Sequence, residues 1–165
     1  MPSSIEVTPR ILVVVPCGIR KIWDKEPNKG PVRAESAYTG PPFKVNSGFA
    51  RKVGYKWVIL SANYGFIDPE FLIPKSYNIT FKDSQTKPIS VKQLKTQVKE
   101  KKLDQYDIVI ALGGPDYVLN VKGSFGGKVK VIAPTRGLRI GEAMGLIKKL
   151  TGMDRIEMLK SMGAL

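Results

Sequence analysis

The 165-residue sequence contains no histidine and a single cysteine, Cys17. Without histidine the chain lacks the commonest general base and the commonest zinc ligand, which excludes Ser-His-Asp and Cys-His catalytic arrangements. One cysteine excludes an internal disulfide framework and disfavours a structural zinc site. We therefore expect no metal site and no cofactor. Any catalysis would use carboxylates, tyrosine, lysine, arginine or the single thiol.

Long apolar runs are also missing. No run approaches the roughly 20 residues that a membrane-spanning helix needs. The first ten residues, MPSSIEVTPR, lack the charged-then-apolar plan of a signal peptide. We therefore expect a cytoplasmic protein without a membrane partner.

Acidic residues are scarce: 14 Asp and Glu stand against 27 Lys and Arg, which gives a formal net charge of +13. A basic excess of this size predicts attraction to polyanions, with nucleic acid (DNA or RNA) or a phosphorylated nucleotide as the expected partner. The alternative is that the charge serves only solubility.

Four short apolar runs predict buried strands, at residues 10–15, 56–60, 107–112 and 129–132. Each is rich in Val and Ile and does not alternate with polar residues, as is typical of a parallel sheet covered on both faces. Helical patterns at residues 44–53, 91–103, 141–150 and 154–162 alternate with them. The sequence thus predicts one α/β domain over residues 1–165, Rossmann-like and three-layered, with a mainly parallel sheet of four to five strands.

Two irregular segments, at about residues 16–43 and 65–90, exceed the usual length of a connection. Loops of this length in a compact domain tend to be functional or mobile. The second segment is interrupted by prolines, and we expect a short edge strand at residues 77–81. Gly54 is expected to end the first helix.

All four predicted strands end in small or polar residues, namely PCG at 16–18, SANYG at 61–65, GGPDY at 113–117 and PTRG at 134–137. Ligands of open α/β sheets bind beyond the carboxyl ends of the strands, and glycines let backbone N–H groups approach them closely. Such residues also make ordinary turns, but four endings of this kind favour a shared pocket.

The candidate ligand-binding residues of this pocket are Gly18, Arg20, Lys21, Tyr38, Ser61, Asn63, Tyr64, Gly65, Gly113, Gly114 and Arg136. The cations Arg20, Lys21 and Arg136 would hold phosphate, and Tyr38 or Tyr64 would contact a base. Tyr77 and Tyr117 also flank the pocket in sequence. Core packing is the alternative role of these tyrosines.

The candidate catalytic residues are Asp116, Asp68 and Cys17. Proton transfer, or stabilisation of an oxocarbenium ion, needs a carboxylate beside the reacting atom. Either aspartate could instead cap a helix or a turn. We favour Asp116 as the catalytic residue because it lies in a glycine-rich strand end. Nearby cations would favour the Cys17 thiolate, so Cys17 is a nucleophile, a wall of the pocket or a packing residue.

Lysines are concentrated before the third strand. Lys92, Lys95, Lys99 and Lys102 follow one another at spacings of three, four and three, which places them on one stripe of a helix. A phosphate backbone could lie along this stripe, although a solvated helix face has the same pattern.

Several motifs occur together: Pro16-Cys17-Gly18 with Lys21, AESAYTG at 34–40, SANYG at 61–65, and Ile73-Pro74 with Tyr77. In combination they resemble a family of uncharacterised small domains of bacteria, archaea and phages. More remotely, ILSANYGFIDPEFLIP at 59–74 resembles the core of the YaaA peroxide-stress family, and the catalytic part of archaeosine synthase carries a comparable PC motif. The resemblance implies an association with DNA or with modified nucleobases.

These observations support a nucleic-acid-associated enzyme that acts on a nucleobase or nucleotide. Cleavage of an N-glycosidic bond, or base exchange or modification, is the reaction class that fits these residues best, because carboxylates can catalyse it without metal or histidine. A non-catalytic DNA- or RNA-binding protein of the YaaA type is the alternative. A binder of small nucleotides, with incidental basic charge, is a third hypothesis.

Overall fold

Four parallel strands and one antiparallel strand form the central sheet in the computed structural model, which describes residues 9–53 and 55–165. The sheet order is β4–β3–β1–β6–β7. The bounds are β1 Ile11–Pro16, β3 Lys56–Ser61, β4 Gly65–Ile67, β6 Ile108–Ala111 and β7 Lys130–Ile132. Strand β1 pairs in parallel with β3 and β6, β6 pairs in parallel with β7, and β4 is antiparallel to β3. The four predicted strands and the mainly parallel sheet are confirmed.

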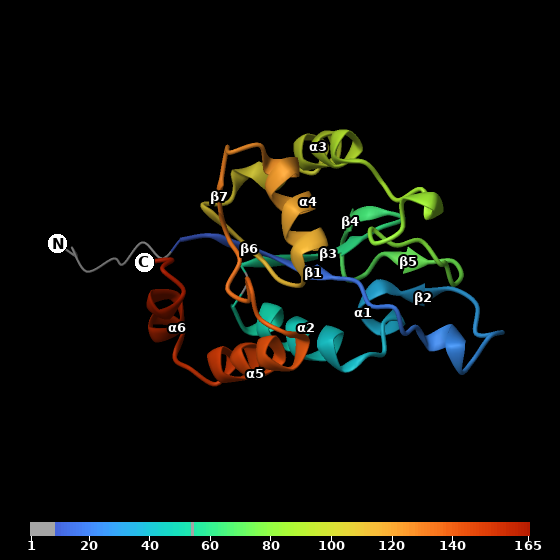
Figure 1. The fold of residues 1–165 in the computed structure, drawn as a ribbon, viewed down its shortest axis with the longest axis horizontal. Helices are drawn as coiled ribbons and strands as arrows, with labels where there is room; N and C mark the ends of the chain where they lie inside the picture. The colour runs from blue at the N-terminus through green and yellow to red at the C-terminus, as the bar shows by residue number, and fades with distance from the viewer. Residues whose placement is uncertain (1–8, 54) are drawn as a thin grey trace.

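Helices cover both faces of this sheet (Figure 1). Their bounds are α2 Pro41–Val53, α3 Val91–Glu100, α4 Pro115–Phe125, α5 Ile140–Thr151 and α6 Arg155–Ser161. Ile11, Val13 and Val15 of β1 pack with α2, α5 and α6, whereas Leu12 and Val14 pack with α3 and α4. Because β1 buries both sets of side chains, its sequence shows an apolar run instead of alternation.

Helix α4 lies in a part of the chain for which the sequence analysis predicted no helix. Pro115 occupies its first turn, where a missing N–H costs nothing, and Gly126 ends it with φ +57°. Between them, the buried Val118, Val121 and Phe125 are spaced three and four residues apart. The helical signal was therefore present in the sequence.

The ends of two other helices differ from the prediction. Helix α2 begins three residues early, at Pro41, and its predicted end at Gly54 lies outside the described residues. Helix α3 ends at Glu100 instead of continuing to residue 103, and Lys102 follows with φ +54°. The prediction of one helical stripe is thus wrong for Lys102. Within residues 9–53 and 55–165, every helix is too short or too polar to span a bilayer.

The two long irregular segments contain short elements that pair with one another. The first holds η1 Ile22–Asp24, β2 Val32–Arg33 and α1 Ala34–Ala37; the second holds β4, β5 Leu72–Ile73 and η2 Ser84–Thr86. Strands β2 and β5 form an antiparallel pair, and the Ala34 amide donates to the Phe71 carbonyl at 2.8 Å. The predicted strand at 77–81 is wrong, because β4 turns back directly after β3 and takes that edge.

Candidate functional site

The loops that follow the four parallel strands meet at the carboxyl edge of the sheet. The Cys17 amide, after β1, donates to the Leu60 carbonyl of β3 at 3.1 Å. Gly113, after β6, has φ +103°, and a Cβ there would lie 2.8 Å from Pro16 Cγ, so only glycine fits. Thr135, after β7, places Oγ1 3.5 Å from the Gly113 carbonyl oxygen. The predicted convergence of the four loops is therefore present in the fold.

Three tyrosine hydroxyls lie beside the Cys17 thiol and the Ser61 hydroxyl. The Cys17 Sγ lies 3.3 Å from the Tyr117 hydroxyl. The Tyr77 hydroxyl lies 2.5 Å from that of Tyr38 and 2.8 Å from Ser61 Oγ. Ser61, Tyr77 and Tyr38 thus form a chain of hydroxyls, and residues from two long loops and one strand end are held together by it.

Ser61 also shapes the turn that carries Tyr64. Its fully buried hydroxyl accepts the amides of Asn63 and Tyr64, each at 3.1 Å. The Tyr64 ring then lies 5.5 Å from Tyr77, edge to face, and 5.2 Å from Phe71. This partly exposed ring is therefore fixed on two sides by aromatic neighbours.

Helix α3 clamps the same turn through Gln97. Its Oε1 accepts the Phe66 amide at 2.8 Å, and its Nε2 donates to the Tyr64 carbonyl at 3.0 Å. Gly65 has φ +79°, and a Cβ there would lie 2.2 Å from Gln97 Oε1. The sequence analysis missed Gln97, since nothing in a helical pattern reveals which turn a polar side chain will reach.

Lys21 is the buried cation of the site, with 6% of its surface exposed. Its Nζ lies 4.6 Å from the centroid of the Tyr77 ring and donates to the Ile19 carbonyl at 3.3 Å. Burial lowers the pKa of Lys21, while the acidic groups of Cys17 and Asp24 act in the opposite direction. Lys21 is therefore a poorly solvated amine held between the Tyr77 ring and the Ile19 carbonyl.

Burial also raises the pKa of Tyr38, Tyr77 and Tyr117 above the ordinary value of 10.0, and the nearby Cys17 adds to the effect. All three are therefore neutral at physiological pH and able to donate and accept hydrogen bonds. We call the assembly the Cys17 cluster; its members are Cys17, Lys21, Tyr38, Ser61, Tyr64, Tyr77 and Tyr117.

The other predicted ligand-binding residues lie in the loops around the Cys17 cluster. Gly18 lies against Tyr38: a Cβ on Gly18 would lie 3.8 Å from Tyr38 Cβ. Arg20, Gly114 and Arg136 are exposed in their loops. Neither arginine forms an ion pair within the described chain.

The two predicted catalytic aspartates are separated by the fold. Asp116 is half-buried in the first turn of α4, and its charge acts on the neighbouring Tyr117. Asp68 is exposed after β4 and pairs with Lys56 at 3.2 Å. Because Ile67 pairs with Ile59 in the antiparallel register, Asp68 follows opposite Val58, three residues or about 10 Å along β3 from Ser61. The structure brings Asp116 to the carboxyl edge and leaves Asp68 outside it.

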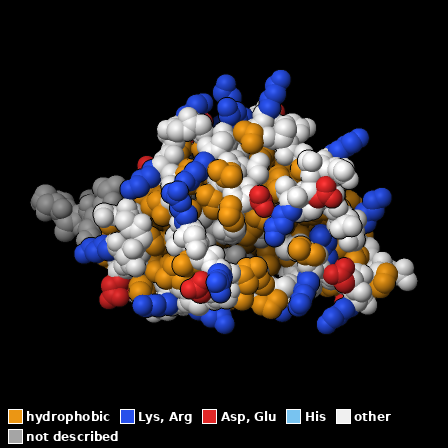
Figure 2. Space-filling model, viewed as in Figure 1, with side chains coloured by type: hydrophobic (Ala, Val, Ile, Leu, Met, Phe, Trp, Pro, Cys, Tyr) orange, Lys and Arg blue, Asp and Glu red, His pale blue; other side chains and the backbone are white. Residues whose placement is uncertain are grey.

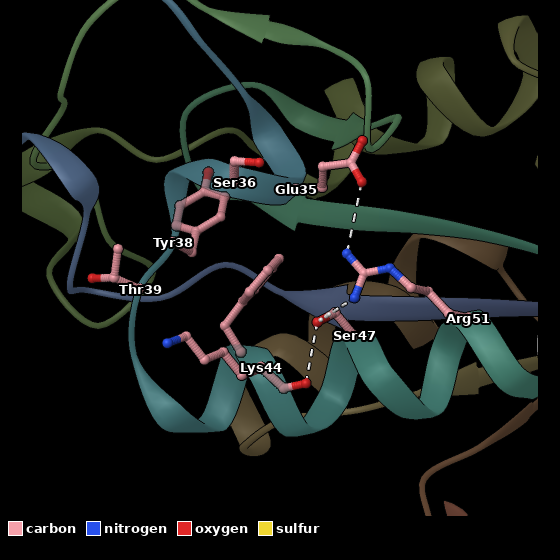
Figure 3. A pocket seen from close by; sticks show the side chains of 8 residues that line it. Glu35, Ser36, Tyr38, Thr39, Lys44, Ser47 and Arg51 are labelled. Atoms are coloured by element: carbon pink, nitrogen blue, oxygen red, sulfur yellow. Dashed lines mark hydrogen bonds and ion pairs between the residues drawn. The ribbon is translucent and has the colours of Figure 1, made fainter. Parts of the chain in front are cut away.

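A hollow of about 210 Å³ lies on the α2 side of Tyr38 (Figure 3). It is lined by Glu35, Ser36, Tyr38, Thr39, Phe43, Lys44, Ser47 and Arg51. Arg51 lies 3.4 Å from Ser47 Oγ and 3.7 Å from Glu35, whereas Lys44 forms no ion pair within the described chain. Tyr38 is the wall that this hollow shares with the Cys17 cluster. Across residues 9–53 and 55–165, no three acidic or thiol side chains gather closely enough to hold a metal ion.

Residues 13–149 match the model of a family of unknown function, DUF6884. The chain belongs to this family. The chain is also similar to a curated relative, the uncharacterized protein YfjM of Bacillus subtilis (strain 168), with 39% identity over 111 residues that cover 66% of this chain and 74% of that protein. No solved structure gives a significant match.

The family match confirms the predicted membership in an uncharacterised domain family, whereas the likeness to YaaA and to archaeosine synthase stays a prediction. The matched span runs from β1 to near the end of α5 and contains every member of the Cys17 cluster. The cluster thus lies within the part of the chain that defines the family.

Proposed function

We propose that the Cys17 cluster binds a nucleobase or nucleotide and that the protein is an enzyme acting on that base, in DNA or RNA. The observation that carries this proposal is the grouping of a partly exposed thiol, a buried cation and four tyrosines at one sheet edge. Aromatic rings stack on bases of any sequence, and neutral hydroxyls bind the polar edges of a base.

We also infer that the fold is Rossmann-like and three-layered. Strands β3 and β6 follow β1 in the chain but lie on opposite sides of it. In sheets that reverse their order in this way, ligands bind beyond the carboxyl ends at the reversal. Cys17 and Gly113 lie at that place, on either side of the reversal.

Cleavage or exchange at an N-glycosidic bond suits the groups at this edge. The bond between the sugar carbon and the base nitrogen breaks, its electron pair leaves with the base, and water or an incoming base forms the new bond to the sugar carbon. Asp116 would stabilise the positive charge on the sugar and take the proton of the incoming nucleophile. Cys17 and Tyr117 would contact the base, and Arg20, Lys21 and Arg136 would bind phosphate.

Mass spectrometry of nucleosides, after incubation of the protein with modified and unmodified DNA and tRNA, tests this proposal. We expect a base to be released or altered, and Asp116→Asn to lower the rate by about 100-fold or more. Asp68→Asn is the matched control, since Asp68 pairs with Lys56 away from the cluster, and should keep the rate within about threefold. No altered base with folded wild-type protein, or full activity of Asp116→Asn, would refute the proposed chemistry.

A non-catalytic nucleic-acid-binding protein is the second candidate, and the net charge of +13 favours it. It predicts steeply salt-dependent binding that survives Cys17→Ser and Asp116→Asn, with no altered base in the same assay.

A further inference from the structure

A groove of about 410 Å³ lies between α3 and the carboxyl end of α4. Its lining residues are Lys92, Lys95, Thr96, Val98, Lys99, Asp104, Ser124, Phe125, Gly126 and Lys128. We call it the lysine groove. Sequence periodicity placed Lys92, Lys95 and Lys99 on one stripe, but only the structure adds Lys128 from a second element and shows that the stripe borders a hollow.

Positive charge dominates the lysine groove. Four lysines face one carboxylate, Asp104, and within the described chain none of the four forms an ion pair. The groove hydroxyls are already engaged, because Thr96 donates to the Lys92 carbonyl at 3.2 Å and Ser124 donates to the Asn120 carbonyl. The free donors of the groove are therefore the ammonium groups, which are suited to an anion.

The surroundings favour a polyanion over a membrane or an apolar partner. Val98 and Phe125, the large apolar residues that line the groove, are 3% and 1% exposed, so the groove itself offers no large apolar side chain for insertion. Lys and Arg side chains gather along the upper edge of the molecule, over α3 (Figure 2). By contrast, α5 and α6 carry lysines interspersed with the acidic Glu142 and Glu157, as on an ordinary solvated face.

The lysine stripe is long enough to contact a phosphodiester backbone. At 1.5 Å per helical residue, Lys92 and Lys99 are separated by about 10 Å along α3. One strand of duplex DNA carries a phosphate about every 3.4 Å of its axis, so this stripe is long enough to meet more than one phosphate. The same helix holds the Tyr64 turn through Gln97, which ties the groove to the Cys17 cluster.

We infer that the lysine groove binds the phosphodiester backbone of a nucleic acid, so that the protein acts on a polynucleotide and not on a free nucleotide. This inference rests on the proposed nucleobase function for the role of the bound strand, but the binding itself can be measured separately.

Fluorescence anisotropy with labelled 20-nucleotide single-stranded DNA, single-stranded RNA and duplex DNA tests the inference over 50 to 300 mM KCl. The full chain is compared with Lys92→Gln/Lys95→Gln/Lys99→Gln and with the matched control Lys148→Gln/Lys149→Gln/Lys160→Gln, which removes the same charge from exposed positions of α5 and α6. We expect the groove variant to lose at least about 10-fold in affinity, and its salt slope to fall by about two to three. The control should change less than about threefold.

Equal losses in the two variants would overturn the inference, because net charge alone would then explain binding. Absence of binding by wild-type protein would also overturn it. All six lysines are exposed, and circular dichroism confirms that both variants are folded. If the groove variant loses affinity but no base is altered, only the proposed chemistry is refuted. If a base is altered in a free nucleotide and the groove variant keeps its affinity for polynucleotides, only the inference about the lysine groove is refuted.

Discussion

Gly65 shows how one residue without a side chain permits the geometry of the Tyr64 turn. Its φ of +79° is unfavourable for any residue with a Cβ, and its open side is filled by the Gln97 carboxamide. A methyl group would collide with the oxygen that accepts the Phe66 amide. The position therefore combines a backbone requirement with a packing requirement.

Gly65→Ala should lower the free energy of unfolding by about 3 kcal/mol, since it adds backbone strain and displaces two hydrogen bonds of Gln97. Gly127→Ala is the matched control: its φ is +81°, but no atom lies within 4 Å of the added Cβ, so only the strain of about 1 kcal/mol remains. Urea unfolding of both variants measures the difference. An equal decrease in the free energy of unfolding of the two variants would show that Gln97 moves aside freely.

At the scale of elements, α3 has three separate tasks on its sides. Leu94 and Val98 are buried against the sheet, Gln97 clamps the β3–β4 turn, and the lysines line the groove. The helix begins with a capping box in which Ser90 accepts the Gln93 amide at 3.1 Å. Each task is carried by different side chains of α3. Replacing Gln97 should therefore disturb the β3–β4 turn without unfolding the helix.

Gln97→Leu should lower the free energy of unfolding by about 2 kcal/mol, because the Phe66 amide and the Tyr64 carbonyl lose their partner. Hydrogen exchange at the Phe66 amide should accelerate in parallel. Gln105→Leu, at an exposed side chain, should change stability by less than about 0.5 kcal/mol. Unchanged protection of the Phe66 amide in Gln97→Leu would contradict the clamp.

At the scale of the whole molecule, the buried tyrosines link the site to overall stability. Tyr38, Tyr77 and Tyr117 ionise near 10.0 in an unfolded chain but at higher pH in the fold. Above pH 10 the unfolded chain therefore holds fewer protons than the folded one, and stability falls as pH rises. Lys21 acts in the opposite sense: its lowered folded pKa makes stability rise with pH until the unfolded lysine also loses its proton near 10.5.

The free energy of unfolding should thus decline above pH 10, by up to about 1.4 kcal/mol per pH unit for each of the three tyrosines. Tyr77→Phe should reduce this slope by the contribution of one tyrosine, and Tyr77→Phe/Tyr117→Phe should reduce it by the contribution of two. Urea unfolding between pH 9 and 11 measures the slopes, and comparing variants cancels the general effect of net charge. A slope unchanged by Tyr77→Phe would show that Tyr77 ionises freely in the fold.

Local patterns predicted the strands well and the helix ends less well. The Val- and Ile-rich runs predicted β1, β3, β6 and β7 within about one residue, because burial on both faces leaves a continuous apolar run. Helix α4 was overlooked even though Pro115 and Gly126 mark its ends. Lys102 was predicted to lie on α3 because the spacing of the lysines continues to it, but the backbone leaves the helical conformation before it, and Lys102 adopts φ +54°.

The sequence by itself determined the class of the fold, the absence of histidine chemistry and the strand ends at which a site could form, because burial and backbone preference are local properties. Only the tertiary structure decided which side chains meet there. Tyr38 and Tyr77 come from two separate long loops to reach Ser61, and Tyr117 comes from 100 residues away to reach Cys17. The fold likewise placed Asp116 at the carboxyl edge and Asp68 beyond β4, where it pairs with Lys56, because the turn at Gly65 sends β4 back along β3.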